Sequence, residues 1–116
     1  MPFDVQRTTR HEVPVLVVTG ELDIATAPQL ADEVGTALGD EPPLLALDLT
    51  GTTFLDSSGA RQIARCAKAA GRAGAVLQVV CPPENRPVRL VFDLLSMDSL
   101  VAVLPSPDLI GRDTRP

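Results

Sequence analysis

The sequence predicts an α/β fold in which a small mixed β-sheet is covered by helices. Three observations predict this class. The chain has 116 residues, about the length of one domain. Short apolar runs rich in β-branched residues alternate along it with stretches of helical periodicity, as in proteins with helix-linked parallel strands. Two strand-like runs come first with no helix between them, which adds an antiparallel pair to the sheet.

The first elements are two strands and a helix. The strands are expected at residues 3–8 and 13–19, where apolar and β-branched residues gather. The helix begins after Thr26, a good N-cap, and Pro28 falls in its first turn, where the missing N–H is not needed. Gly39 is the expected stop. The apolar face of this helix consists of Leu30, Val34, Ala37 and Leu38.

The middle of the chain continues with a buried strand. Residues 44–49 form a short apolar run between breakers, which is typical of an inner strand of a parallel sheet. Residues 51–55 are expected only to connect this strand to the next helix. The remaining elements are a helix from residues 56–59 to about residue 70, a strand at 75–80, a helix at 87–96 and a strand at 101–104.

The last helix and the end of the chain carry two further expectations. In the helix at 87–96 we expect Leu90, Val91, Leu94 and Leu95 to face the core. Residues 105–116 contain three prolines and show no periodicity, so we expect a flexible tail after a domain that spans residues 1–104.

The charge balance excludes several classes of function. Ten basic residues against fifteen acidic ones give a net charge of −5, which disfavours binding to nucleic acid or to an anionic membrane. The apolar runs are far shorter than the roughly 20 residues needed to span a bilayer. The first ten residues show no apolar segment of a secretory signal, so we expect a cytoplasmic protein.

Residues for catalysis or metal binding are scarce. Cys66 and Cys81 are too few for a disulfide framework or a zinc site, and we interpret both as buried thiols in a reducing compartment. His11 is the only histidine, stands among charged residues, and is expected to be solvated. A Ser-His-Asp arrangement would have to use it. We therefore expect no enzyme, no metal and no cofactor.

Two loops gather polar side chains. Residues 20–26 and residues 50–59 each follow a strand, and both carry carboxylates and hydroxyls, whereas most other loops carry prolines or glycines. In α/β sheets, function is found in loops at the carboxyl ends of strands. We therefore expect a functional site formed by these two loops.

Residues 56–59 (Asp-Ser-Ser-Gly) begin a helix and admit two compatible interpretations. In the first, Ser57 or Ser58 is the N-cap, and Asp56 complements the helix dipole. In the second, one serine is phosphorylated, which adds roughly −1.5 to −2 charges at neutral pH. The helix amides and Arg61, three residues beyond Ser58, would favour such a phosphate, and Asp56 would repel it.

Three stretches of the chain carry a resemblance to a known family: Gly20-Glu21-Leu22-Asp23 with Thr26, Ala27 and Leu30; Leu47-Asp48-Leu49 with residues 54–59; and Val88-Arg89-Leu90 with Phe92, Asp93 and Leu100. The ordered set covers about residues 3–104. It resembles the STAS domain family, specifically the anti-sigma factor antagonists of bacteria.

The resemblance implies a STAS-like single domain that acts through partner switching. The unphosphorylated antagonist binds an anti-sigma factor, which is also a serine kinase with a histidine-kinase-like ATPase fold, and so frees a sigma factor. The kinase then phosphorylates and releases the antagonist, and a serine phosphatase resets the cycle. By position, Ser58 is the phosphoacceptor. The implied partner-binding residues are Asp23, Thr26, Asp56, Ser57, Gly59 and Arg61.

This chain also departs from the family pattern. Many relatives have a Leu-Gly pair after Gly59, whereas this chain has Ala60 and Arg61. The final helix that often closes these domains is absent from the pattern, because residues 108–110 are too short to form it. Two alternatives stay open: an accessory subunit of a membrane lipid or anion transport assembly, and a scaffold subunit of a stress-sensing complex.

Overall fold

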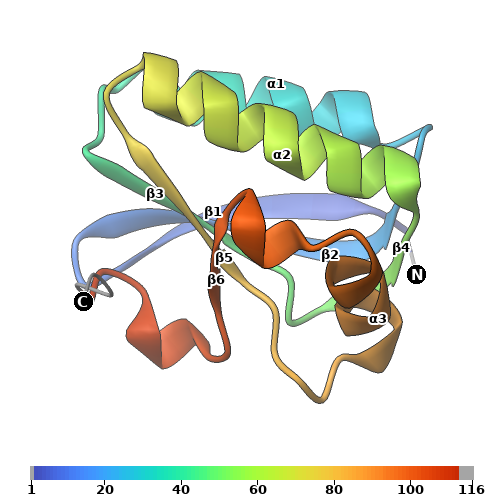
Figure 1. Ribbon diagram of the computed structural model, residues 1–116. Coiled ribbons are helices and arrows are strands. Elements are labelled where there is room, and N and C mark those ends of the chain that lie inside the picture. Colours follow the sequence, from blue (N-terminus) through green and yellow to red (C-terminus); the bar gives the residue numbers. More distant parts are fainter. Residues whose placement is uncertain (1, 113–116) are drawn as a thin grey trace.

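A six-stranded mixed sheet with three α-helices forms the protein, as the computed structural model shows for residues 2–112 (Figure 1). This confirms the predicted α/β class with a helix-covered mixed sheet. The elements are β1 (Asp4–Arg10), β2 (Val13–Leu22), α1 (Ala27–Leu38), β3 (Leu44–Asp48), β4 (Thr52–Leu55), α2 (Ser57–Arg72), β5 (Val76–Val80), α3 (Arg86–Leu94), the 3₁₀ turn η1 (Met97–Ser99), β6 (Ala102–Leu104) and the 3₁₀ turn η2 (Pro107–Leu109).

The strand order is β1-β2-β3-β5-β6, with β4 paired to β2 off this path. β1 and β2 form the expected antiparallel hairpin, and every other pair is parallel. The hairpin turn consists of His11 and Glu12, whose φ angles of 50° and 67° are both in the left-handed region. Two such residues give the tight turn whose twist matches that of the paired strands.

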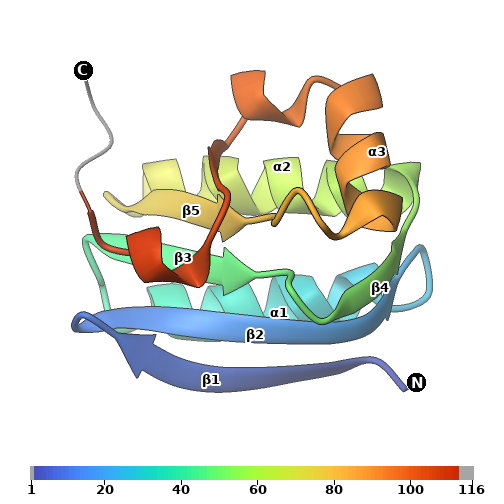
Figure 2. The same cartoon turned by 90° about the horizontal axis from the view of Figure 1, so that it is seen from below.

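Alternate residues of β2 pack on the two faces of the sheet. Leu16 and Val18 join the main core beneath α1 and α2, which lie side by side on one face (Figure 1). Val13 and Val15 join a smaller cluster on the other face. Figure 2 shows the C-terminal segment passing across that second face.

The C-terminal segment differs from the expected flexible tail over residues 105–112. Ile110 is fully buried in the smaller cluster, and Asp108 accepts a 2.8 Å ion-pair hydrogen bond from Arg10. The side chain of Gln78 accepts a hydrogen bond from the backbone N–H of Gly111. These contacts join residues far apart in sequence, so local composition could not reveal them. The rest of the predicted tail, residues 113–116, lies outside the described residues.

β4 is a strand where the sequence predicted only a connection. Its residues pair in parallel with the last part of β2, beyond the point where β3 stops pairing with β2. A tight turn, closed by a 3.0 Å hydrogen bond from Thr52 N–H to the backbone oxygen of Leu49, separates β3 from β4. Along the edge of β2 that faces away from β1, the strand thus pairs first with β3 and then with β4.

α3 turns a different face to the core from the one expected. Val88 and Phe92 are buried, whereas Leu90 and Leu94 are 60% and 73% exposed. The prediction that Leu90, Leu94 and Leu95 face inward is therefore wrong, and Val91 is half-buried. The physical reason is the inward position of Arg89, which donates a 3.0 Å hydrogen bond to the backbone oxygen of Cys81.

Candidate functional site

The two polar loops meet at one edge of the sheet, because the strands before them are hydrogen-bonded neighbours. Leu22 at the end of β2 pairs with Leu55 at the end of β4. One residue further on, the N–H of Asp56 donates to the backbone oxygen of Leu22 at 3.4 Å. The loop that contains Asp23 therefore adjoins the N-terminus of α2, into which β4 leads directly (Figure 1).

Asp56, and neither serine, is the N-cap of α2. Its carboxylate accepts a 2.8 Å hydrogen bond from the N–H of Gly59, and its backbone is extended. The expectation that Ser57 or Ser58 caps the helix is therefore wrong. Ser57 is exposed and Ser58 is half-buried, and among residues 2–112 no hydrogen bond engages either hydroxyl. A carboxylate thus does the capping, and both serines keep their oxygens free.

Gly59 brings α2 into close contact with the sheet. The glycine is buried, and a Cβ at this position would lie 2.5 Å from the backbone oxygen of Leu22 and 2.8 Å from Cδ1 of Leu55. Any other residue would therefore displace the first turn of the helix from the strand ends. Gly59 positions the serines from below and does not face outward.

Asp23 and Thr26 close the neighbouring loop on itself. The Thr26 hydroxyl accepts a 2.9 Å hydrogen bond from the N–H of Asp23 and donates at 2.9 Å to the backbone oxygen of Glu21. The Asp23 carboxylate accepts hydrogen bonds from the N–H groups of Ala25 and Thr26. Thr26 occupies the predicted N-cap position of α1, yet its side chain makes no capping bond to that helix. The hydroxyl instead rigidifies the loop beside the serines.

Arg61 lies on the exposed side of α2 in the turn that follows the serines. It is four residues beyond Ser57 and three beyond Ser58, separations at which side chains on a helix are neighbours. Within residues 2–112 it forms no ion pair, whereas Arg7, Arg10 and Arg89 do. Its guanidinium is thus available to a group at the first turn of the helix.

Asn85 contributes to the site although the sequence did not point to it. Its side-chain amide donates to the backbone oxygens of Leu49 and Thr52 at 2.9 and 2.8 Å. These two bonds hold the turn between β3 and β4, and so the start of the strand that leads into the helix with the serines. An asparagine just before a helix is ordinarily interpreted as an N-cap, and for that reason this role gave no signal in the sequence.

The other reactive side chains lie away from this site. His11 is at the opposite end of β2, roughly 30 Å along a ten-residue strand, where its Nδ1 is 2.9 Å from the backbone oxygen of Ile110. Cys66 and Cys81 are free and buried. Burial raises the pKa of both thiols, opposed at Cys66 by a hydrogen bond from Gln62 and at Cys81 by the charge of Arg89. No described arrangement therefore joins a serine to a histidine base.

The described part of the chain contains neither a metal-binding cluster nor a membrane-spanning helix. No cluster of three or more His, Cys, Asp or Glu side chains within residues 2–112 is placed to hold a metal ion. None of the helices described there has the length and apolar character to cross a membrane.

Comparisons with known proteins agree with the fold described above. The family model for the STAS domain matches residues 4–108. The anti-sigma-F factor antagonist RsfB of Mycobacterium tuberculosis (strain H37Rv) is 35% identical over 60 residues, which are 52% of this chain and 49% of RsfB. The chain thus spans about half the length of the curated relative it matches.

Three solved structures share the fold over most of its length. The crystal structure of an anti-sigma factor antagonist from Mycobacterium paratuberculosis has a TM-score of 0.81 at 28% identity, over 92% of this chain and 89% of that one. The unphosphorylated form of the anti-sigma factor antagonist SpoIIAA has a TM-score of 0.64 at 18% identity, over 92% of this chain and 91% of that one. The phosphorylated form of SpoIIAA, from Bacillus, has a TM-score of 0.61 at 19% identity, over 89% of this chain and 91% of that one.

Proposed function

Because the chain belongs to the STAS domain family, we propose that it is an anti-sigma factor antagonist that acts by partner switching. Unphosphorylated, it binds an anti-sigma factor that is also a serine kinase of the histidine-kinase-like ATPase fold, and this frees a sigma factor. Phosphorylation of Ser58 by the kinase breaks the complex, and a serine phosphatase restores the antagonist. The similarity to RsfB and to the Mycobacterium paratuberculosis antagonist supports the general role.

One observation carries the proposal: two uncommitted hydroxyls stand on a rigid turn at an exposed corner of the molecule. Asp56 caps the helix, Gly59 allows it to pack on the strand ends, and the hydroxyls of Ser57 and Ser58 have no hydrogen-bond partner among residues 2–112. A kinase needs a hydroxyl in a fixed place that its own active site can reach. The first turn of α2 meets that need without any refolding of the domain.

The proposed reaction moves one phosphoryl group. The Ser58 Oγ attacks the γ-phosphorus of ATP, the bond between that phosphorus and the β–γ bridging oxygen breaks, and ADP leaves. The hydroxyl proton passes to a base of the kinase. The product phosphate faces the free N–H groups at the start of α2, which favour an anion, and Arg61 on the next turn. Asp56 opposes it as a like charge.

The added charge is large enough to act as a switch. A phosphate enclosed without a partner in an interface formed around a neutral hydroxyl costs about 3–5 kcal/mol. This corresponds to a loss of affinity of roughly two to three and a half orders of magnitude. Such a loss converts a tight complex into a weak one, while the fold of the antagonist stays intact.

We propose different roles for the remaining site residues. Ser57, Arg61 and the exposed parts of Asp23 and Asp56 contact the partner directly. Thr26 and Gly59 act indirectly, because the Thr26 hydroxyl is engaged in its own loop and Gly59 is buried.

The test is a phosphorylation assay with purified proteins. The antagonist is incubated with ATP and each candidate anti-sigma factor kinase of its source genome, and the modified residue is located by mass spectrometry. We expect one phosphate, on Ser58. The Ser58→Ala variant should bind the kinase and stay unmodified, Ser58→Asp should lose binding, and Ser57→Ala should still be phosphorylated. A phosphate on another residue, or none with any kinase, contradicts the proposal; equal binding of Ser58→Ala and Ser58→Asp excludes charge as the switch.

A further inference from the structure

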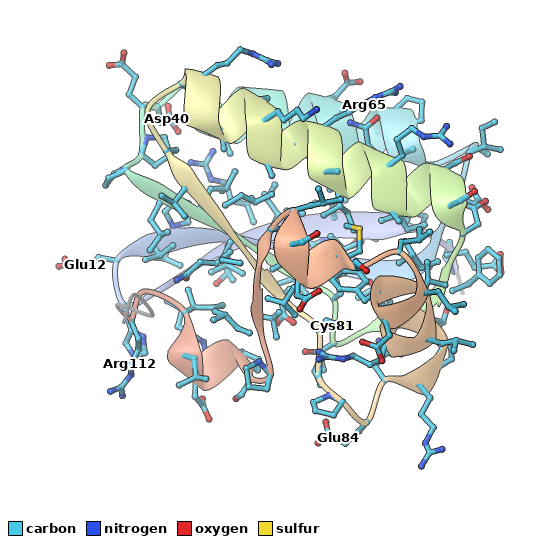
Figure 3. The ribbon with its side chains drawn as sticks, in the orientation of Figure 1. Glu12, Asp40, Arg65, Cys81, Glu84 and Arg112 are labelled. Atoms are coloured by element: carbon cyan, nitrogen blue, oxygen red, sulfur yellow. The ribbon has the colours of Figure 1, made fainter. Side chains whose placement is uncertain are left out.

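α2 carries four cationic side chains on its solvent side: Arg61, Arg65, Lys68 and Arg72, called here the α2 basic stripe. All four are exposed, and spacings of four, three and four residues place them on one side of the helix. The buried residues of α2, which include Ile63, Cys66 and Ala70, lie on the opposite side. In Figure 3, Arg65 projects from the outer surface of the helix, away from the sheet.

The stripe concentrates positive charge on an acidic protein. Four of the ten basic residues of the chain are on α2, and none of its fifteen acidic residues is. No residue of the stripe forms an ion pair within residues 2–112, although Arg7, Arg10 and Arg89 each pair with a carboxylate there. No carboxylate of residues 2–112 is therefore within ion-pair distance of the stripe.

The stability of the helix does not explain the stripe. Like charges three or four residues apart repel each other, and each neighbouring pair of the stripe has such a spacing. The helix dipole favours cations in the last turn, which accounts for Arg72 but disfavours Arg61, close to the N-terminus. A row of like charges that destabilises its own helix along a whole exposed face is typical of a binding surface.

We propose that the α2 basic stripe is a docking surface for an acidic face of the anti-sigma factor. The inference rests on the proposed function and names the chemistry of its partner. A protein partner is favoured over nucleic acid because carboxylates lie near the N-terminal end of the stripe. Glu21, Asp23 and Asp56 are at the strand ends where α2 begins. A uniformly anionic polymer or membrane would meet repulsion there, whereas a protein surface can match both signs.

The position of the stripe also explains how a single phosphate weakens the whole docking interface. Ser57 and Ser58 precede Arg61 by one turn, so the proposed phosphoacceptor Ser58 lies at the N-terminal end of the stripe. A phosphate there adds negative charge at the place where the acidic face approaches and reduces the net positive potential of the stripe. The partner is then repelled along the same surface that attracted it.

The experiment compares charge reversals on two helices. Arg65→Glu changes the stripe two turns away from the serines, and Arg86→Glu makes the same change of charge at an exposed position of α3. Association of each purified variant with the anti-sigma factor is measured by surface plasmon resonance at low ionic strength and at about 0.15 M salt. Thermal unfolding of each free variant checks the fold.

We expect Arg65→Glu to slow association roughly tenfold or more at low ionic strength and to weaken its salt dependence. Arg86→Glu should stay within about twofold of the unmodified protein, because it lies outside the docking surface. Removing one repelling cation should leave the thermal midpoint of Arg65→Glu unchanged or raised.

Three outcomes overturn the inference. If the anti-sigma factor binds the unmodified protein and Arg65→Glu alike at both salt concentrations, the stripe is not its docking surface, and the proposed function still stands. If it does not bind the unmodified protein at all, the proposed function fails and the inference with it. If duplex DNA or phosphatidylglycerol vesicles bind the unmodified protein but not Arg65→Glu, the occupant is not a protein.

Discussion

The Cβ atom that Gly59 lacks would lie 2.5 Å from the backbone oxygen of Leu22. Leu22 is the last residue of β2, and Gly59 is the third residue of α2, so the helix that presents the serines rests on a strand end. Side chains do not tolerate so close an approach to a carbonyl oxygen. The position of both hydroxyls thus depends on the absence of one methyl group below them.

A methyl group at this position should therefore destabilise the protein. Gly59→Ala is expected to lower the free energy of unfolding by about 1–3 kcal/mol, because the first turn of α2 must move away from the strands. Urea denaturation followed by circular dichroism measures the change. Gly71→Ala is the matched control on the same helix: nothing lies within 4 Å of its Cβ, so stability should rise by up to about 1 kcal/mol. Destabilisation of similar size in both variants would contradict this account of Gly59.

Asp56 should have two separable roles. Asp56→Ala removes the oxygen that accepts from the N–H of Gly59, and we expect a loss of about 1 kcal/mol of stability. Asp56→Asn keeps an oxygen in the same place, so its stability should change by only a few tenths of a kcal/mol. Thermal unfolding distinguishes the two variants, and binding to the kinase shows whether the charge itself matters to the partner. If Asn destabilises as much as Ala, the carboxylate charge, and not the hydrogen bond, holds the helix end.

The place of the site was predictable because it depends on local patterns. Runs of apolar residues predicted strands at 13–19 and 44–49, and the polar loops expected after them, residues 20–26 and 50–59, contain the residues of the candidate site. The details at the atomic level were not predictable. Both Asp56 and the serines suit an N-cap, and only the approach of α2 to Leu22 decides which of them occupies it.

β4 and α3 show why longer-range features escaped the sequence. β4 has only four residues, and its pairing with β2 depends on the turn that ends β3. α3 has apolar residues on more than one side, so periodicity alone could not fix its rotation. Contacts with distant residues do: the Asn85 side chain bonds to Leu49 and Thr52, and Arg89 bonds to Cys81.

The observed orientation of α3 predicts effects of mutation on stability that are opposite to those expected from the sequence pattern. Phe92→Ala removes a buried ring and should lower the free energy of unfolding by about 3–5 kcal/mol. Leu94→Ala removes a side chain that is 73% exposed and should change it by no more than about 0.5 kcal/mol. Urea denaturation of both variants gives the comparison. A larger loss of unfolding free energy for Leu94→Ala than for Phe92→Ala would indicate that α3 buries the face expected from the leucine spacing.

The two buried thiols should make the stability of the protein fall in alkaline solution. Burial raises the pKa of Cys66 and Cys81 above the ordinary value of 9.0, so the folded protein binds these protons more tightly than the unfolded chain. The contribution is complete below pH 9 and is lost as the pH rises through 9 toward the pKa values of the folded state. The chain has no tyrosine and its only lysine is the exposed Lys68, so few other side chains titrate in this range. Urea denaturation between about pH 8 and pH 10 should show the decline, and a Cys66→Ala/Cys81→Ala variant, although less stable throughout, should show a shallower one. An equally steep decline without the thiols would assign the alkaline sensitivity to other groups.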